Sequence, residues 1–405
     1  MTVELHRLAN GLTIAVEQMP GMETAAAGLY IDSGSRGETE AKTGLAHMVE
    51  HMVFKGAGSR DAKAIAEDIE DVGGSLNAWT ARDHTVFHAR IMPGDLTLAI
   101  DMIADLVRAP WFDAGELERE KQVVLAELGE SRDTPDDIVF DHLHAAAFGG
   151  AALGRPVLGN EESINGFDVS DLGDWIATQY RPSNLVLAAA GKVDADKLLK
   201  LAEARFGDLV PGAMPAIVDA PFTGGRTADQ RDLDQVHLAF AYQGTSFTAD
   251  DLHALSLFSA ITGGGMASRL FQQVREQRGL AYSIYSWLQP FRDTGLFGVY
   301  CAANDDQAHE AYELSRQILH EAAENLTEAE LNRAKAQGRA GLLMGLESVA
   351  ARCDNLARQI QIHGRIVLPS ELVAQSEAVT VAQCRAAAQA MLSSPQAFAT
   401  VGAMA

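Results

Sequence analysis

The sequence predicts an α+β fold made of two similar domains that are related by duplication. Its 405 residues exceed the size of one ordinary domain. Helical and β-hairpin patterns alternate in both halves, which favours largely antiparallel sheets with helices packed on one face. The segment FDAGELEREK (112–121) also matches LTEAELNRAK (326–335) at four positions. Together these observations indicate that one folding unit occurs twice in the chain.

Strands are predicted in the first half by alternating apolar residues and, in one place, by a continuous apolar run. They are residues 5–17, with a turn at Asn10 and Gly11, 25–31, 75–80, 85–91 and, as the apolar run, 184–191. Helical periodicity predicts the helices between these strands. They are residues 43–56, 61–72, 95–108, 113–130, 136–147, 170–180 and 194–206.

Residues 207–229 hold three Pro and four Gly with little periodicity, so they are the best candidate for a linker. We expect a first domain over residues 1–212, a linker over 213–229 and a second domain over 230–405. In the second domain SSPQAFATVG (393–402) is a weaker counterpart of YRPSNLVLAAAG (180–191). The other elements predicted there are strands 236–242, 281–288 and 295–302 and helices 252–261 and 268–277.

The net charge is −23 and it is unevenly shared. Residues 1–212 hold 35 acids and 18 bases, a balance of −17, whereas residues 213–405 hold 20 and 14, a balance of −6. Nucleic acid is therefore not expected as a partner. The acidic first half favours cationic ligands, and the alternative explanation is simple solubility.

Cysteine usage and hydropathy place the chain among cytoplasmic globular proteins. The three cysteines, Cys301, Cys353 and Cys384, are odd in number and have no metal-type spacing, so neither disulfides nor cysteine ligands are expected. No apolar run reaches the roughly 18 residues of a membrane span. The first residues, MTVELHRLANGL, do not resemble a signal peptide.

The strongest chemical signal is the pattern H-x-x-E-H formed by His47, Glu50 and His51. On a helix the two histidines lie one turn apart on the same face, with the glutamate beside them. Two neutral imidazoles can bind zinc while the carboxylate remains free as a general base. The alternative is a buried structural helix whose histidines have no chemical role. Buried His and Glu side chains need partners, however, and a metal supplies them.

A catalytic zinc site has three protein ligands, so one is still missing from this pair of histidines. The predicted helix 113–130 offers carboxylates on one stripe, those of Glu116, Glu120 and Glu127. Helix geometry alone does not choose among them, nor does it exclude Glu130 one turn after Glu127. A glutamate at such a position can instead be a salt-bridge partner, for example of Arg119 or Lys121.

The chain resembles the M16 family of zinc metallopeptidases, most closely the branch of the mitochondrial processing peptidase β subunit and its bacterial relatives. The match runs almost from end to end. Its specific pieces are HRLANGLTIAVE (6–17), GSRGETE (34–40), HMVEHMVFKG (47–56), LNAWTARDHTVFHA (76–89), ELEREKQVVLAELGE (116–130), DHLHAAAFGGAALGRPVLG (141–159), YRPSNLVLAAAG (180–191) and RLFQQVREQRGLAY (269–282).

The resemblance implies one zinc ion per chain, bound by His47, His51 and Glu127, with Glu50 as the catalytic base. It implies that Glu120 is the family's further glutamate near the site, able to orient a ligand. It also implies that two residues of the second domain, Arg275 and Tyr282, reach the substrate. Both have a plain structural alternative, as a helix-surface arginine and a strand-face tyrosine.

The resemblance further implies that extended peptide pairs with the strand around Leu76, Asn77 and Ala78, where an exposed edge offers main-chain groups. On the same hairpin, Trp79, His84 and His88 are expected to serve in packing or at the rim of the site. His142 and His144 resemble a second metal pair, but they match a family segment without a ligand role and are expected to be structural.

We therefore expect a zinc endopeptidase that cuts peptides or unfolded segments, working as a homodimer or with a related non-catalytic chain. The alternative is a non-catalytic assembly or chaperone-like subunit, related to the core proteins of respiratory complexes, that only binds peptide. The intact metal motif argues against that alternative. The short ITGGGMASRLF (261–271) replaces an extended glycine-rich loop of the mitochondrial partner subunit, which puts presequence processing in doubt.

Overall fold

The computed structural model describes residues 2–213 and 216–404, whose contacts divide them into two compact units. The first unit consists of the described residues up to Leu128 together with Pro156–Val218 and Gly345–Val367. The second consists of Gly129–Arg155, Asp219–Met344 and the described residues from Leu368 onward. Each half of the chain thus contributes one segment to the unit built mainly by the other half.

The first unit is built on a six-stranded sheet in the order β1-β2-β8-β3-β7-β6. Its strands are β1 (Thr2–Arg7), β2 (Thr13–Gln18), β3 (Ala25–Ile31), β6 (Ser75–Thr80), β7 (Thr85–Ile91) and β8 (Leu185–Gly191). Strands β2 and β8 pair in parallel, and the other neighbours are antiparallel. All residues of the central strands β3 and β8 are buried, which explains their continuous apolar sequences. Strand β6 lies at one edge of the sheet.

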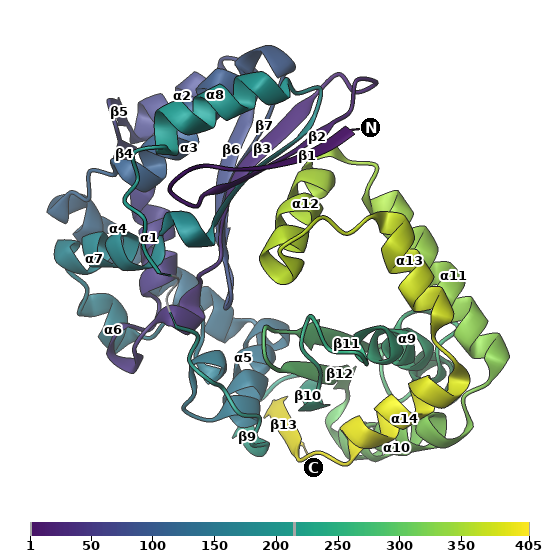
Figure 1. The fold of residues 1–405 in the computed structure, drawn as a ribbon. Helices are drawn as coiled ribbons and strands as arrows, with labels where there is room; N and C mark the ends of the chain where they lie inside the picture. Colours follow the sequence, from purple (N-terminus) through teal and green to yellow (C-terminus); the bar gives the residue numbers. More distant parts are fainter. Residues whose placement is uncertain (1, 214–215, 405) are drawn as a thin grey trace. The chain divides into compact units, whose positions relative to one another are not determined.

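One face of this sheet carries most of the unit's helices (Figure 1). They are α1 (Leu45–Val53), α2 (Ala62–Glu70), α3 (Leu96–Arg108), α4 (Ala114–Asp133), α6 (Glu161–Asn165), α7 (Val169–Gln179) and α8 (Ala195–Phe206). The core lies between these helices and the sheet, where Leu29 and Phe87 pack with Met48 and Ile100. A short ribbon, β4 (Gly56–Ala57) with β5 (Arg60–Asp61), connects α1 to α2.

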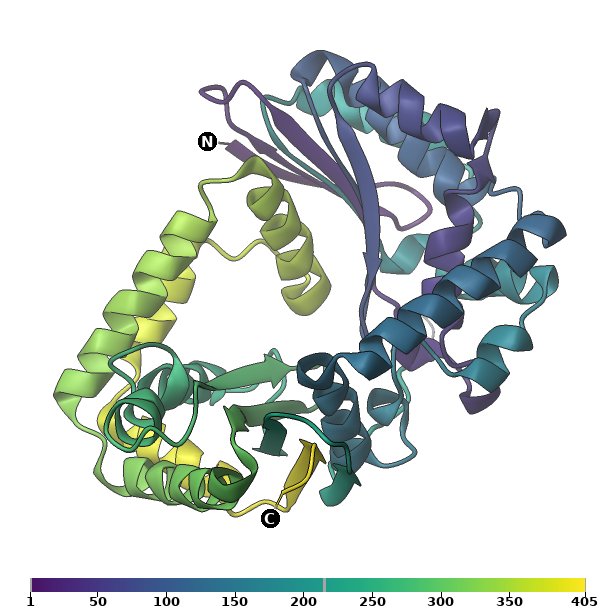
Figure 2. The same ribbon diagram turned by 180° about the vertical axis from the view of Figure 1, so that it is seen from behind.

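The opposite face of the first sheet carries α12 (Val349–His363), which comes from the second half of the sequence (Figures 1 and 2). Leu356 of α12 packs with sheet residues such as Val186 in a second apolar cluster. The Tyr30 hydroxyl donates to Sγ of Cys353, and Arg352 forms an ion pair with Glu17. The helix is therefore part of the folded first unit.

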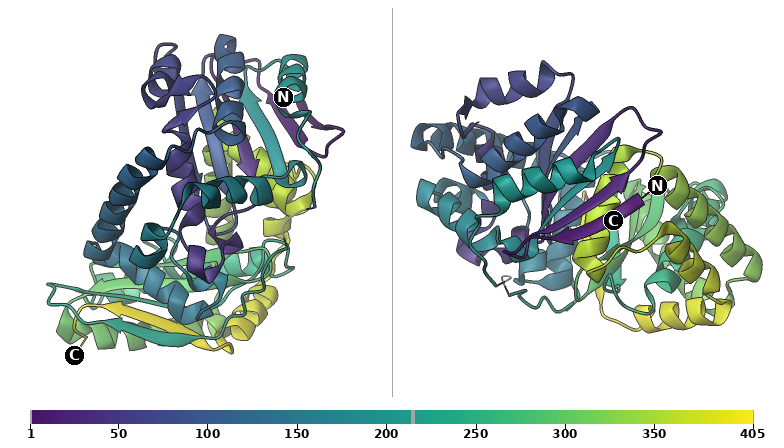
Figure 3. Two further views of the ribbon diagram at one scale, coloured as in Figure 1. Left: turned by 90° about the vertical axis from the view of Figure 1, so that its left-hand side faces the viewer. Right: turned by 45° about the horizontal axis from the view of Figure 1, so that its top comes forward.

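The second unit is built on a five-stranded sheet in the order β11-β12-β10-β13-β9. Its strands are β9 (Gly225–Asp229), β10 (Val236–Gln243), β11 (Ser283–Pro290), β12 (Gly295–Ala303) and β13 (Gln396–Val401). The yellow C-terminal strand β13 lies beside its neighbours in Figure 3, parallel to β9 and antiparallel to β10. The other pairs are antiparallel.

The two sheets repeat one topology, which confirms the predicted α+β fold of two similar domains. The run β2-β8-β3-β7-β6 corresponds to β9-β13-β10-β12-β11, with the parallel pair at the same place. One face of the second sheet packs against α9 (Leu252–Gly263), α10 (Asp305–Asn325), α11 (Glu328–Gly345) and α14 (Val381–Leu392). The other face packs against α5 (Pro135–Phe148), which comes from the first half. The helices α5 and α12 are thus exchanged between the units symmetrically.

The remaining elements are short or lie at the ends of larger ones. They are α13 (Pro369–Ala378), the 3₁₀ turns η1 (Ser35–Gly37), η2 (Glu40–Lys42), η3 (Pro93–Asp95), η4 (Ala152–Gly154) and η5 (Pro182–Asn184), and η6 (Phe271–Glu276). The helix predicted at 268–277 contains η6, which is π-helical. The last five residues of the predicted linker form β9. Because two segments are exchanged, the domain boundaries at 212 and 230 stay a prediction. None of the helices in the described parts of the chain has the length and hydrophobicity to cross a membrane.

Candidate metal centre

The motif helix α1 is held by its apolar side chains. Met48, Val49 and Met52 are fully buried against the first sheet and its neighbouring helices, so the rotation of α1 about its axis is fixed by packing. The two motif histidines are only half-buried and emerge one turn apart on the remaining face. The local sequence therefore determines where both imidazoles point.

The start of α1 is fixed by Gly44 and Glu38. Gly44 has φ of +92°, and a Cβ there would lie 2.6 Å from the backbone oxygen of Leu158, so glycine is required on both counts. The buried Glu38 carboxylate accepts hydrogen bonds from the backbone N–H groups of Gly44 and Ala46, each at 2.8 Å. A carboxylate at this end of a helix satisfies two free N–H groups and complements the helix dipole.

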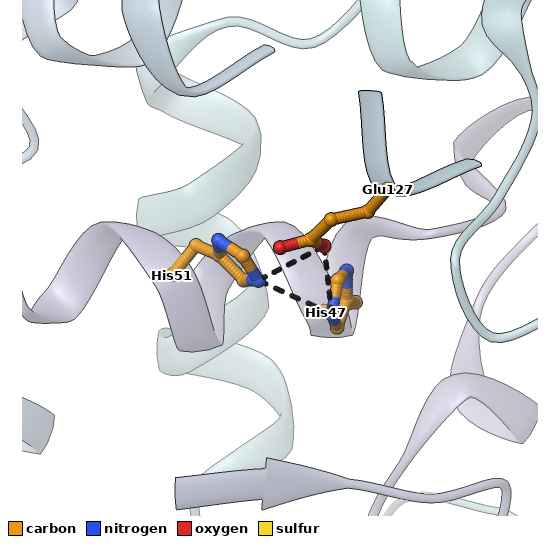
Figure 4. A group of neighbouring side chains, drawn as sticks. All are labelled: His47, His51 and Glu127. Atoms are coloured by element: carbon orange, nitrogen blue, oxygen red, sulfur yellow. Dashed lines mark hydrogen bonds and ion pairs between the residues drawn. The ribbon is translucent and has the colours of Figure 1, made fainter. Parts of the chain in front are cut away.

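His47, His51 and Glu127 converge on one point, with both histidines on α1 and the glutamate on α4 (Figure 4). The Nε2 atoms of the histidines are 3.2 Å apart. Oε2 of Glu127 lies 3.5 Å from Nε2 of His51 and 3.9 Å from Nε2 of His47. Among the described residues, these three side chains form a group of potential metal ligands. Each offers one ligand atom, and the three atoms all lie within 4.8 Å of one another.

The trio fits a zinc ion in donor set and spacing. Two histidines and one glutamate are a known ligand set for catalytic zinc, and nitrogen ligands at 2.0–2.1 Å in a tetrahedron lie ~3.3 Å apart. The observed Nε2 separation of 3.2 Å agrees with that value. Oε2 of Glu50 is buried and finds no hydrogen-bond partner among the described residues. The structure thus leaves the carboxylate that the motif predicts as a base with a free oxygen.

Burial sets the protonation of the two central side chains. It lowers the pKa of His47 to about 3, with a further contribution from His51, so the imidazole is neutral as a metal ligand must be. Burial also raises the pKa of the Glu50 carboxyl, and the charge of Glu127 raises it further, while Thr80 and His51 oppose the shift. A carboxylate with a raised pKa is a better proton acceptor at neutral pH.

Glu120 lies on the other side of His51 from the point shared by the trio. Its Oε1 is 2.8 Å from Nδ1 of His51, and its Oε2 is 2.7 Å from Nζ of Lys55. An ionised carboxylate only accepts, so Nδ1 of His51 carries the proton and its Nε2 presents a lone pair. The alternative role as a salt-bridge partner applies to Glu116, which pairs with Arg119, while Lys121 pairs with Glu118.

The predicted peptide-binding residues lie on the edge strand β6. Leu76 and Ala78 face the core that includes α1, whereas Asn77 and Trp79 alternate to the other face. Trp79 and His88 line a cavity of about 290 Å³ on that face, and the His84 ring packs edge-on to Trp79 at 4.6 Å. Within the described residues, the outer edge of β6 that strand addition requires is free, while peptide binding itself stays a prediction.

Arg275 and Tyr282 lie in the second unit, at the end of η6 and just before β11. The guanidinium of Arg275 lies over two rings, 4.7 Å from the centroid of Phe271 and 4.9 Å from that of Tyr282. The Tyr282 side chain is 74% exposed, so its hydroxyl is open to a ligand. The structure brings these two residues together, and their role toward substrate stays a prediction.

The other histidines of the first sequence half have structural contacts. His142 lies 3.4 Å from Asp229, and Nδ1 of His144 lies 3.1 Å from the backbone oxygen of Leu153. Neither belongs to the group of potential metal ligands found in the described chain. The three cysteines are free and buried.

Two neighbours of the site, Thr80 and Lys55, were not predicted from sequence. Thr80 is on β6, two residues after Ala78, so strand alternation alone puts it on the face toward α1. Lys55 follows His51 by four residues, a spacing that brings side chains together on a helical turn. Both signals were present in the sequence, but nothing in it named Glu120 as the partner of Lys55.

Comparison with known proteins gives matches over most of the chain. A sequence profile described as "Insulinase (Peptidase family M16)" matches residues 13–161, and one described as "Peptidase M16 inactive domain" matches residues 166–337. An "Uncharacterized zinc protease" of Mycobacterium tuberculosis is 37% identical over 405 residues, which cover 98% of this chain and 92% of that protein. The mitochondrial-processing peptidase subunit beta of Lentinula edodes is 35% identical over 410 residues, covering 96% and 87%.

Solved structures share the fold. A protease from Helicobacter pylori superposes with a TM-score of 0.92 over 99% of each chain at 20% sequence identity. A protein from Pseudomonas fluorescens described as a peptidase M16 inactive domain superposes equally well, at 24% identity over 99% of this chain and 98% of that one. At these identities the likeness concerns the fold alone.

Proposed function

Because the chain belongs to the M16 family of zinc proteases, we propose that it is a zinc endopeptidase that hydrolyses peptides or unfolded polypeptide segments. The observation that supports this most directly is the convergence of His47, His51 and Glu127 beside a buried, unpartnered oxygen of Glu50. A subunit that only bound peptide would have no use for a free base next to a ligand trio. The proposal therefore favours turnover over the binding-only alternative.

The chemistry divides between the metal and the chain's own residues. A zinc ion held by the trio would supply Lewis acidity, which makes water acidic at neutral pH and polarises a carbonyl. Glu50 takes the proton from the attacking water and later returns it to the leaving amine. Glu120 holds the proton of His51 at Nδ1, so that Nε2 of His51 stays available as a ligand.

The edge strand β6 provides the means to hold an extended substrate. Its residues Leu76, Asn77 and Ala78 pair on one side with β7, and on the other side no strand of the described residues pairs with them. A peptide added there exchanges main-chain hydrogen bonds with β6, which requires no particular sequence. Thr80 of the same strand is near enough to Glu50 to influence its pKa, so a peptide along β6 would pass the proposed base.

The working assembly is proposed to be a homodimer, with a related non-catalytic chain as the alternative partner. The proposal follows from the family to which the chain belongs. Analytical ultracentrifugation of the pure chain distinguishes a homodimer from a chain that needs a different partner. A stable monomer without activity that gains activity on adding a second chain would favour the heterodimer.

The phenol of Tyr282 is expected to contribute to kcat. If it donates to the substrate oxygen as negative charge develops there, Tyr282→Phe lowers kcat on the order of 10²-fold and leaves zinc content unchanged. The substitution keeps the ring that stacks with Arg275. Steady-state kinetics and metal analysis of the variant test this. The control is Tyr285→Phe, because Tyr285 is also exposed, at 39%. Equal kcat for wild type and Tyr282→Phe would assign the tyrosine to packing.

Basic peptides are expected to be cut faster than acidic ones at low salt. The first sequence half has a balance of 35 acids against 18 bases, or −17, and such a field raises the local concentration of cations. The advantage should shrink as salt rises, since exposed charges are screened beyond roughly 10 Å at 0.1 M. Two peptides that differ only in flanking Lys or Glu residues provide the measurement. Equal kcat/KM at low salt would leave the acidity as a solubility feature.

A further inference from the structure

Glu120 uses its two carboxylate oxygens for two different partners. Oε1 is 2.8 Å from Nδ1 of His51, and Oε2 is 2.7 Å from Nζ of Lys55. The Glu120 side chain is only 5% exposed, so water has little access to replace either partner. Lys55, Glu120 and His51 therefore form a continuous chain of charge-assisted contacts that ends on a candidate metal ligand.

The backbone around Lys55 is held from both sides. Its N–H donates to the backbone oxygen of Met52 at 3.1 Å, which continues the turn of α1 past the helix end. The next residue, Gly56, accepts from the backbone N–H of Trp111 at 2.9 Å, and the Trp111 ring fills the space where a Cβ on Gly56 would be. The lysine is thus presented to Glu120 from a fixed position.

We propose that Lys55 is a positioning residue for the metal centre, acting through Glu120 on His51. With Oε2 held by Lys55, the plane of the carboxylate is fixed and Oε1 stays directed at Nδ1 of His51. That contact fixes both the tautomer and the ring orientation of His51, so its Nε2 lone pair points to the place shared with His47 and Glu127. The proposal rests on the proposed function in taking zinc as the ligand.

A simpler role for Lys55 is to neutralise a buried carboxylate. The direction in which zinc affinity changes when Lys55 is replaced distinguishes this role from the positioning role. Lys55→Met removes a positive charge from the neighbourhood of the site. By Coulomb's law this change alone favours binding of a divalent cation. A fall in zinc affinity is therefore opposite in sign to the direct effect of the lost charge, as expected for loss of the ordered Glu120 contact.

The main experiment measures zinc affinity of the full chain by competition with a chromophoric chelator, without any activity assay. Lys55→Met is expected to weaken zinc binding about 10-fold, at the lower end of what loss of an outer hydrogen-bond partner costs. Lys55→Arg keeps the charge and donors and is expected to bind zinc more tightly than Lys55→Met. Unchanged or increased affinity in Lys55→Met would overturn the proposal.

The matched control is Lys42→Met. Lys42 lies in the same unit, its side chain is 34% exposed against 32% for Lys55, and it forms an ion pair of 2.5 Å with Asp171. The substitution Lys42→Met removes the same charge and a similar ion pair, but Asp171 does not contact a candidate ligand in the described structure. Its zinc affinity should equal that of wild type. A loss in Lys42→Met as large as that in Lys55→Met would show a general effect of stability and overturn the proposal.

A double-mutant cycle tests whether Lys55 acts through Glu120. In a Glu120→Gln background the carboxylate is gone, so adding Lys55→Met should not weaken zinc binding further. This pair also remains informative if Lys55→Met alone folds poorly, because the double variant leaves no unpaired buried carboxylate. A further fall in affinity in the double variant would show that Lys55 acts by another route.

The wild-type titration separates failure of this proposal from failure of the proposed function. Tight, stoichiometric zinc in wild type with no difference in Lys55→Met overturns the role of Lys55 alone. No zinc binding by wild type overturns the proposed zinc peptidase and the role of Lys55 with it. Zinc binding that falls in Lys55→Met and Glu120→Gln without further loss in the double variant supports both.

Discussion

Glu50→Gln is expected to retain about one zinc per chain and to lower kcat by roughly 10²–10⁴-fold, the usual contribution of a positioned general base. Glutamine has nearly the same shape as glutamate but cannot accept the proton of the attacking water. The side chain lies outside the trio of candidate ligands, so metal binding should persist. Metal analysis and single-turnover kinetics on one peptide measure both quantities on the same sample.

The control for this substitution is Glu67→Gln. Glu67 is a glutamate of the same unit whose side chain is 57% exposed and pairs with Lys63. Its loss removes the same charge without touching the site, and kcat should stay at the wild-type value. Turnover by Glu50→Gln at the wild-type rate would show that Glu50 is not the base. Loss of zinc from Glu50→Gln would show that the carboxylate supports the metal instead.

Much of the fold follows from local pattern because most of its strands are short and bounded by turns. The predicted strand 25–31 and hairpin 75–80 with 85–91 agree with β3, β6 and β7 to the residue. Strand β6 alternates along its length and follows Gly73 and Gly74, whereas β3 is a continuous apolar run. The similarity between sequence segments of the two halves also indicated that the fold is repeated. Local sequence patterns were enough to predict those elements whose structure depends on residues close in sequence.

The exchange of α5 and α12 could not be predicted in that way. Nothing in the periodicity of either helix states which sheet it covers. Their destinations depend on pairings such as Arg352 with Glu17, which are 335 residues apart in sequence. The π-helical turn η6 is a similar case, because its hydrogen-bond pattern leaves no signature in the spacing of apolar residues. These features depend on tertiary contacts.

At the site, the helix pattern predicted His47, Glu50 and His51, but it left the third ligand open. Glu120 and Glu127 are seven residues apart on α4 and so lie two turns apart on one stripe. Only the placement of α4 against α1 separates them, with Glu127 facing Nε2 of both histidines and Glu120 facing Nδ1 of His51. The resemblance to the family already implies that Glu127 is the third ligand.

Glu127→Ala is expected to release zinc and abolish turnover together. The carboxylate is the one acidic member of the trio, and two neutral histidines do not complete a site of three protein ligands. Zinc affinity should fall by more than the roughly 10–100-fold that loss of an outer partner such as Glu120 costs. The Glu127 side chain is 38% exposed, so its truncation should disturb packing little. Chelator competition and kcat/KM are the measurements.

Glu130→Ala is the matched control, since Glu130 is an exposed glutamate on the same helix one turn later. It removes the same group and charge from α4, and zinc content and kcat/KM should remain those of wild type. Comparing Glu127→Ala with Glu120→Gln then ranks two of the glutamates that helix geometry left open. If Glu120→Gln lost zinc completely while Glu127→Ala kept it, the ligand would be Glu120. The metal would then have to bind at the Nδ1 side of His51, away from His47.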